Sequence, residues 1–237
     1  MTLPFYITTE RNDPLVNDIA DRVFKTLESI GQVRIPRENK GAGPWGTGPY
    51  SSTAWYVDHA RDPRRGQADL GRLWDLYNRE PWQREPHHEL VLLETDLFRP
   101  GMNFLFGETN GHVTSSGHIV EDVSRQRPGT FVQGSIQSAH RIRPYQRNFP
   151  LAFFGIILHE LGHFFGLASA SNPNKSQGSD GLIGGHCEDR RCIMEQVNIR
   201  GKLDLLAKVQ IVARTNPRWF CDADYTAIRE NLRRLYR

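Results

Sequence analysis

His159, Glu160 and His163 form an HExxH pattern, the residue combination in this chain best suited to chemistry. On a helix, side chains four residues apart lie on one face, so both imidazoles can reach a single zinc ion at about 2.0–2.1 Å. Glu160 is rotated by about 100° from His159 around the same helix. It can therefore stand beside the metal and act as the general base that activates water. The pattern predicts a catalytic zinc site.

The residues around this pattern indicate a buried helix. The apolar neighbours are Leu151, Phe153, Phe154, Ile156, Ile157, Leu158, Leu161, Phe164, Phe165 and Leu167. Two imidazoles and a carboxylate in such a helix need partners, because each unsatisfied buried polar group costs about 1–3 kcal/mol. On a helical wheel, small residues line the rest of the histidine face, namely Ala152, Gly155 and Gly166. This arrangement favours a metal centre over histidines that only satisfy hydrogen bonds in a core.

A glycine follows the pattern at Gly166, and the resulting HExxHxxG resembles the metzincin branch of zinc peptidases. Metzincins carry a third histidine three residues after this glycine, where the present chain has Ser169. Further along the chain lies the pattern HCxxxxCxM, formed by His186, Cys187, Cys192 and Met194. This pattern resembles the archaemetzincin family. The resemblance implies an insertion at roughly residues 168–185, with His186 as the third zinc ligand and Met194 as an apolar floor, the Met-turn.

Two other residues compete with His186 for the place of third ligand. Glu188 lies 25 residues beyond His163, the distance at which thermolysin-like enzymes place a glutamate ligand. Asp180 lies inside the inserted segment. His186 is favoured because its neighbours match the family string, whereas the rivals match only in distance.

The archaemetzincin family also carries a second, structural zinc on four cysteines. The corresponding positions here are Cys187, Cys192, Cys221 and Asp224, and carboxylate is an accepted zinc ligand. The resemblance thus implies a second candidate metal site. The alternative is that Cys187 and Cys192 are simply buried thiols and that Asp222 or Asp224 caps the terminal helix.

Composition narrows the class of protein. The 237 residues, 38% hydrophobic and 24% charged, are typical of one soluble domain with a cleft. The start of the chain does not resemble a secretory signal, and three cysteines do not make a disulfide framework, so we expect a cytoplasmic monomer. The net charge of +3 is mild. The cluster of arginines near the C-terminus is interpreted as a solvated helix face; it consists of Arg229, Arg233, Arg234 and Arg237. We expect neither a nucleic-acid nor a membrane partner.

Hydrophobic periodicity predicts the elements that position the site. A helix runs from Pro14, after the N-cap Asp13, to Gly31, and another covers 70–77 and ends near Pro81. The HExxH helix opens at 148–150, and two more helices cover 203–212 and the region of 225–235. Strands are predicted at 4–8, 32–35, 90–93 and 102–106, with a polar edge strand at 111–121. Residues 41–50 are read as a connector and not as a phosphate-binding loop.

These elements combine into an α/β (α+β), metzincin-like zincin fold with a twisted mixed sheet and backing helices. Residues 1–166 are expected to form an N-terminal subdomain and 167–237 a smaller C-terminal one. The expected function is zinc-dependent peptide hydrolysis with Glu160 as general base, on a peptide that adds to the strand at 111–121. The alternative is a latent zinc protein that binds peptide or protein, in which the polar segment 168–185 covers the cleft or supplies a fourth ligand.

Overall fold

A computed structural model describes residues 2–45, 51–79, 85–110, 112–113, 119–120, 133–167, 175–176, 186–195 and 202–237. The helices are α1 (Pro14–Gly31), α2 (Thr53–Ala60), α3 (Leu70–Tyr77), η2 (Arg143–Asn148), α4 (Phe149–Gly162), η3 (His163–Leu167), α5 (Lys202–Thr215) and α6 (Asp222–Tyr236). The strands are β1 (Phe5–Thr9), β2 (Arg37–Gly41), β3 (Ala68–Asp69), β4 (His88–Leu93), β5 (Leu97–Phe98), β6 (Gly107–Asn110), β7 (His112–Val113), β8 (Ile119–Val120), β9 (Gly134–Ser138), β10 (Lys175–Ser176) and β11 (His186–Cys187).

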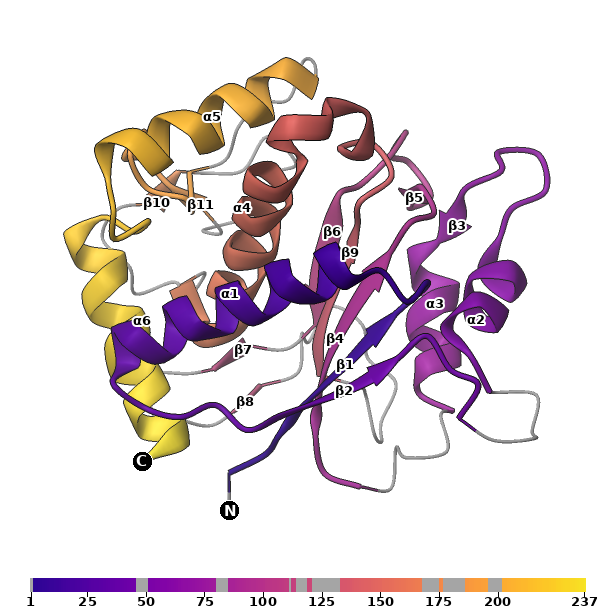
Figure 1. Cartoon of the computed structure of the whole chain (residues 1–237), viewed down its shortest axis with the longest axis horizontal. Coiled ribbons are helices and arrows are strands. Elements are labelled where there is room, and N and C mark those ends of the chain that lie inside the picture. The colour runs from indigo at the N-terminus through magenta and orange to yellow at the C-terminus, as the bar shows by residue number, and fades with distance from the viewer. Residues whose placement is uncertain are drawn as a thin grey trace.

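A five-stranded sheet in the order β2-β1-β4-β9-β6 forms the centre of the fold (Figure 1). All neighbouring strands pair in parallel except β6, which runs antiparallel to β9. The sheet is therefore mixed, as predicted, and β6 is the edge strand on the side of α4.

Helices cover both faces of this sheet (Figure 1). Along β4, Leu90 and Leu92 join the core shared with α1 and α4, whereas Val91 and Leu93 join a second core with α2 and α3. Successive side chains of a strand point to opposite faces, so one continuous apolar strand supplies both cores. This explains why β4 is buried along its whole length.

Helix α1 begins and ends as the sequence predicts. The side chain of Asp13 accepts a hydrogen bond from the backbone N–H of Leu15 at 2.8 Å, and Pro14 is the first helical residue. At the other end Gln32, not Gly31, takes the left-handed conformation, with φ of 52°. A Cβ on Gly31 would lie 2.9 Å from Cβ of Leu232, so this glycine allows α1 and α6 to pack closely.

Two predicted strands are wrong. The strand predicted at 32–35 is found at Arg37–Gly41, and the strand predicted at 102–106 is found at Gly107–Asn110. Both observed strands are edge strands with polar sequences, RENKG and GETN, so neither shows the apolar alternation on which the prediction relied. The connector at 41–50 lies partly outside the described residues.

The interior strand β9, between β4 and β6, was not predicted from the sequence. Its sequence GSIQS holds a single large apolar residue, yet every residue of the strand is buried. A Cβ on Gly134 would lie 2.0 Å from the backbone oxygen of Glu89, so only glycine fits beside β4 at that point.

The predicted edge strand at 111–121 lies mostly outside the described residues. The parts that are described, β7 and β8, pair with each other in a separate antiparallel ribbon. The sheet edge beside the HExxH helix is therefore β6, and the prediction for 111–121 was wrong in this respect.

Residues 143–167 are long and apolar enough to span a membrane, but most of this stretch is buried inside the fold. The helices predicted at 203–212 and around 225–235 correspond to α5 and α6. One core cluster joins residues from Phe5 to Tyr236, and the division of the chain at residue 166 stays a prediction.

Candidate metal centre

Helix α4 and its continuation η3 carry the HExxH residues: His159 and Glu160 lie on α4, and His163 is the first residue of η3. Pro150 stands in the first turn of α4, and the helix continues into η3, where Gly166 adopts a φ of 86°. This left-handed conformation is one that glycine adopts without steric cost, so Gly166 can turn the chain away from the helix axis. The side-chain amide of Asn231 on α6 donates to the carbonyl oxygen of Phe165 at 2.7 Å and holds the turn against α6.

The structure brings His159, His163 and His186 together. One ring nitrogen from each lies within 4.8 Å of the others, and Nε2 of His159 is 3.0 Å from Nε2 of His163. Two nitrogen ligands at about 2.0–2.1 Å from a tetrahedral zinc ion lie about 3.3 Å apart. The three imidazoles, which come from α4, η3 and β11, therefore fit the ligand set of a zinc ion.

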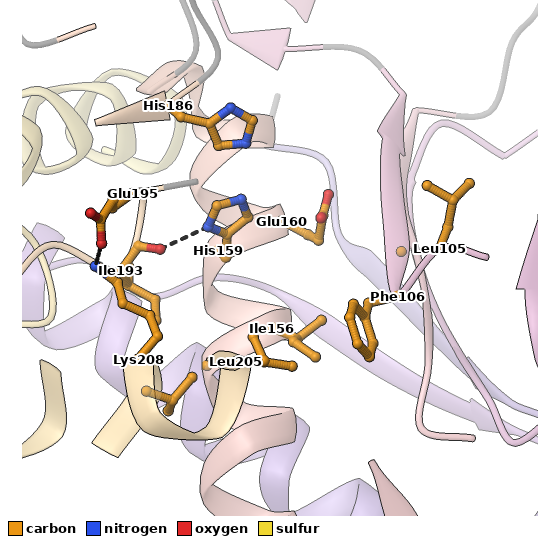
Figure 2. Close-up of a pocket in the computed structure, with 13 residues that line it drawn as sticks. Leu105, Phe106, Ile156, His159, Glu160, His186, Ile193, Glu195, Leu205 and Lys208 are labelled. Atoms are coloured by element: carbon orange, nitrogen blue, oxygen red, sulfur yellow. Dashed lines mark hydrogen bonds and ion pairs between the residues drawn. The ribbon is translucent and has the colours of Figure 1, made fainter. Parts of the chain in front are cut away.

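A backbone carbonyl orients the first of these rings. Nδ1 of His159 lies 2.7 Å from the carbonyl oxygen of Ile193 (Figure 2), so Nδ1 carries the hydrogen and Nε2 presents its lone pair to the cluster. Burial, and then the nearby His186, lower the pKa of His159 to about 4. Burial and His159 likewise lower the pKa of His163. Neutral imidazoles are the form that binds metals.

Glu160 stands on the neighbouring side of the helix and points toward β6 (Figure 2). Its Oε2 atom lies 3.0 Å from Oγ1 of Thr109 on β6. Burial raises the pKa of Glu160 to about 7, although the hydrogen bond from Thr109 opposes the shift, and Glu108 adds to it. A carboxyl group with a pKa near neutrality can both accept and release a proton.

Thr109 was not singled out from the sequence. It belongs to a polar edge strand that shows no hydrophobic period, and its partner in the chain is 51 positions away. Only the pairing of β6 beside α4 reveals the contact.

A cavity of about 240 Å³ opens beside His159 and Glu160 (Figure 2). Its apolar wall is formed by Leu105, Phe106, Ile156, Ile193, Leu205 and Val209. The ammonium group of Lys208 on α5 donates to Oε2 of Glu195, and both residues also line the cavity. The cavity therefore combines a mostly apolar wall with one ion pair.

Met194 packs directly under α4. A Cβ on Gly162 would lie 2.4 Å from Sδ of Met194, so the absence of a side chain on Gly162 allows the sulfur to approach the helix backbone. Met194 is 1% exposed and belongs to the main core. Its position fits the apolar floor that the resemblance implied.

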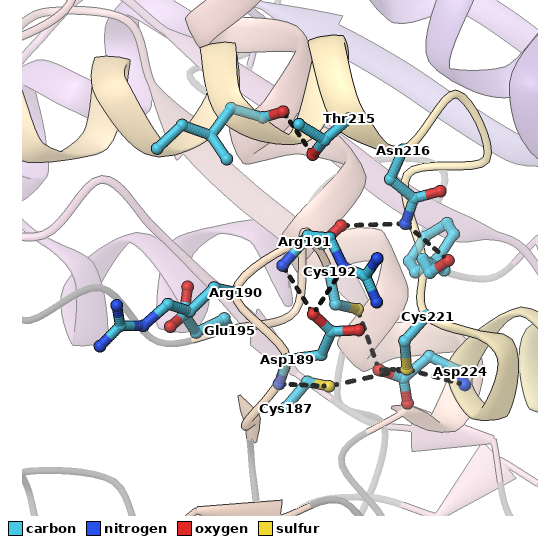
Figure 3. Close-up of polar contacts among 12 residues, drawn as sticks. Cys187, Asp189, Arg190, Arg191, Cys192, Glu195, Thr215, Asn216, Cys221 and Asp224 are labelled. Atoms are coloured by element: carbon cyan, nitrogen blue, oxygen red, sulfur yellow. Dashed lines mark hydrogen bonds and ion pairs between the residues drawn. The ribbon is translucent and has the colours of Figure 1, made fainter.

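Cys187, Cys192, Cys221 and Asp224 form a second cluster, and all four are buried (Figure 3). The sulfur atoms of Cys187 and Cys221 are 3.7 Å apart, and Oδ2 of Asp224 lies 3.1 Å from Sγ of Cys192. Sulfur ligands at about 2.3 Å from a tetrahedral zinc ion lie about 3.8 Å apart. The spacing of this cluster fits zinc as well.

The pKa values of the thiols in this cluster shift in opposite directions. Hydrogen bonds from Cys187 and Cys192 lower the pKa of Cys221, whereas hydrogen bonding to Cys187 and Cys221, together with burial, raises the pKa of Cys192. Asp224 is fully buried, and Cys221, not an aspartate, is the N-cap residue of α6. Three thiols and a carboxyl group in such proximity can all ionise only with a cation between them.

The rival ligands do not join the histidine cluster in the described part of the chain. Glu188 is exposed and belongs to neither candidate cluster. Asp180 and Ser169 lie outside the described residues, as does nearly all of the segment 168–185.

The fold and the two clusters define a mixed α/β protein whose buried helix carries a candidate metal centre. No protein-family model matches the chain. Over 182 residues, 76% of this chain and 75% of the relative, it is 24% identical to an archaemetzincin of Methanopyrus kandleri.

Solved structures show the same likeness. The crystal structure of the Methanopyrus kandleri archaemetzincin matches with a TM-score of 0.56 at 21% identity, covering 98% of this chain and 96% of that one. A zinc-dependent peptidase from Methanocorpusculum labreanum matches with a TM-score of 0.53 at 18% identity, covering 94% and 99%. The chain is thus archaemetzincin-like, and its fold is the archaemetzincin fold.

Proposed function

We propose that this protein is a zinc-dependent peptidase. The observation that carries the proposal is the convergence of three imidazoles beside the carboxyl group of Glu160, at the wall of a cavity. The similarity to an archaemetzincin and to a zinc-dependent peptidase supports the same activity.

His159, His163 and His186 would hold the catalytic zinc ion. Such an ion acts as a Lewis acid that polarises a peptide carbonyl and makes water more acidic. The hydrogen bond from His159 to Ile193 fixes the ring so that Nε2 faces the other two imidazoles. Because Gly162 has no side chain, Met194 packs directly against the helix backbone and leaves the floor of the site apolar.

Glu160 is the proposed general base. It accepts a proton from the attacking water and then donates it to the amine of the departing peptide segment. A pKa of about 7 suits both steps, because the ionised and the protonated forms are then close in free energy near neutral pH.

The substrate is proposed to be a peptide in extended conformation. Strand β6 stands at the edge of the sheet and packs against α4, so it supports docking of a peptide by strand addition. The apolar cavity lies next to Glu160 and suits an apolar side chain near the bond to be cleaved.

A second, structural zinc ion is proposed at Cys187, Cys192, Cys221 and Asp224. Cys187 directly follows His186 in the chain, and Cys192 directly precedes Ile193. A metal at this site would therefore hold both the third ligand and the carbonyl group that orients His159.

The proposal is tested with the Glu160→Ala variant of the full chain. Peptide cleavage should fall to background while zinc content stays at the wild-type value, because Glu160 is not a ligand. Chelation of the wild-type protein should abolish cleavage, and added zinc should restore it. Undiminished turnover by Glu160→Ala would reject the mechanism, and a wild-type protein that binds zinc without cleaving any peptide would favour the latent alternative.

A further inference from the structure

Thr109 makes two contacts with Glu160. Its Oγ1 atom lies 3.0 Å from Oε2 of the carboxyl group and 2.9 Å from the backbone carbonyl oxygen of the same residue. The backbone carbonyl already accepts a hydrogen bond from the N–H of His163 within the helix. The single hydroxyl hydrogen of Thr109 is therefore assigned to the hydrogen bond with the carboxylate, because hydrogen bonds to charged acceptors are stronger than those to neutral ones.

A second hydroxyl supports the first from behind. Oγ of Ser135 lies 2.9 Å from Oγ1 of Thr109, and the side-chain amide of Gln137 donates to Oγ of Ser135. The hydroxyl hydrogen of Ser135 has two acceptors within reach, Oγ1 of Thr109 at 2.9 Å and the carbonyl oxygen of Glu108 at 3.2 Å. The contact with Thr109 is the shorter one, and when Ser135 donates to it, the hydrogen bonds of Gln137, Ser135 and Thr109 all point toward the carboxylate of Glu160.

The sheet fixes the position of this chain of hydroxyls. Thr109 and Ser135 are direct partners in the register of β6 and β9, so their side chains stand next to each other on one face. Ser135 and Gln137 are fully buried. The hydroxyl group that reaches Glu160 is therefore carried by a strand that is paired on the sheet. A paired strand holds a side chain more rigidly than a loop does.

We propose that Thr109 is a positioning residue for Glu160: it holds one carboxylate oxygen on the sheet, so that the other oxygen faces the reacting water. This inference rests on the proposed peptidase function. The hydroxyl group of Thr109 contacts neither the substrate nor the metal ligands in this role. Its loss should therefore slow proton transfer without weakening the binding of peptide or zinc.

Two variants separate the hydroxyl group from the shape of the side chain. Thr109→Val keeps the branched shape and removes the hydroxyl, whereas Thr109→Ser keeps the hydroxyl. We expect Thr109→Val to lower kcat by about ten- to a hundredfold, the range for a lost hydrogen bond to a charged group, with KM and zinc content near wild type. Thr109→Ser should stay within about threefold of the wild-type kcat. Thr26→Val, which removes an exposed hydroxyl on α1 that bonds to the carbonyl of Arg22, is the matched control and should leave kcat unchanged.

The outcomes distinguish this inference from the proposed function. A wild-type protein without peptidase activity would reject the function itself. An active wild type, combined with a folded, zinc-loaded Thr109→Val variant of unchanged kcat, would overturn only the role of Thr109. Should Thr109→Val fail to fold, Thr109→Ala takes its place with the same expected loss. A Thr109→Ser variant that loses kcat as strongly as the hydroxyl-free variants would also contradict the inference.

Discussion

The ring of His159 donates a hydrogen bond from Nδ1 to the carbonyl oxygen of Ile193 across 2.7 Å, which links the HExxH helix to the segment 186–195. The backbone N–H of Ile193 in turn donates to the carbonyl oxygen of Trp219 at 2.7 Å, two residues before Cys221. The histidine cluster and the cysteine cluster are thus connected through the same short segment.

This connection predicts that the cysteine cluster supports the histidine cluster. Asp224→Asn removes the buried carboxylate ligand, so zinc content should fall from two ions per chain toward one, and the remaining zinc should dissociate faster. Elemental analysis and chelator competition measure both effects. Asp222→Asn is the control, because the Asp222 side chain is 86% exposed on the same helix. One zinc per wild-type chain would contradict the second site.

The close contact between Gly162 and Met194 predicts a cost for any side chain at residue 162. In Gly162→Ala the added methyl group would meet Sδ of Met194, and overpacking of this kind costs about 1–3 kcal/mol of unfolding free energy. Urea denaturation of the zinc-loaded protein measures the change. Gly71→Ala on α3, where the nearest atom would be 3.3 Å away, should shift the unfolding free energy by less than about 1 kcal/mol. Equal stability of Gly162→Ala and wild type would show that Met194 moves aside freely.

The pairing of Asp13 with Arg143 predicts a pH-dependent contribution to stability. Burial acts to raise the pKa of Asp13, but hydrogen bonds from Arg143 and from the N–H of Leu15 outweigh it and lower the pKa. The contribution is therefore fully present above the unfolded-state pKa of about 3.9, and it is lost as the pH falls through the lower folded-state value.

Asp13→Asn tests this prediction, because asparagine keeps the helix cap and removes the charge. The variant should be less stable than wild type by about 0.5–1 kcal/mol at pH 7, the scale of a partly exposed ion pair, and the difference should shrink below about pH 3. Asp58→Asn serves as the control, since the Asp58 side chain is 71% exposed and lies 3.6 Å from Arg61. A difference that is constant from pH 7 to pH 3 would contradict the assignment.

The sequence was sufficient to predict the helices and strands that are held in place by apolar side chains. Helix α4 and strand β4 carry continuous apolar runs, and α1 has a regular period with a recognisable cap, so all three were predicted with nearly correct bounds. His186 and the cysteine cluster could be named only through the resemblance to a family, because no local period connects residues so far apart in the chain.

The strands and contacts that the sequence did not predict are held by polar groups and close backbone contacts. Strand β9 is buried although the polar Ser135 and Gln137 alternate along it, and these side chains form hydrogen bonds with each other and with Thr109 on the neighbouring strand. The contact between Thr109 and Glu160 depends on the register of β6 and β9, which no pattern in the sequence fixes. For the same reason the sheet edge was expected at 111–121 and not at β6.

In the proposed peptidase, three histidines alone hold the catalytic zinc ion. A crystal of the zinc-loaded protein, measured at the zinc absorption edge, tests it directly through the anomalous difference map. We expect a peak at about 2.0–2.1 Å from one nitrogen of each of His159, His163 and His186, with no further protein ligand. A fourth ligand from residues 168–185 would contradict the peptidase and favour the latent protein, and the absence of a peak at these histidines would reject the site.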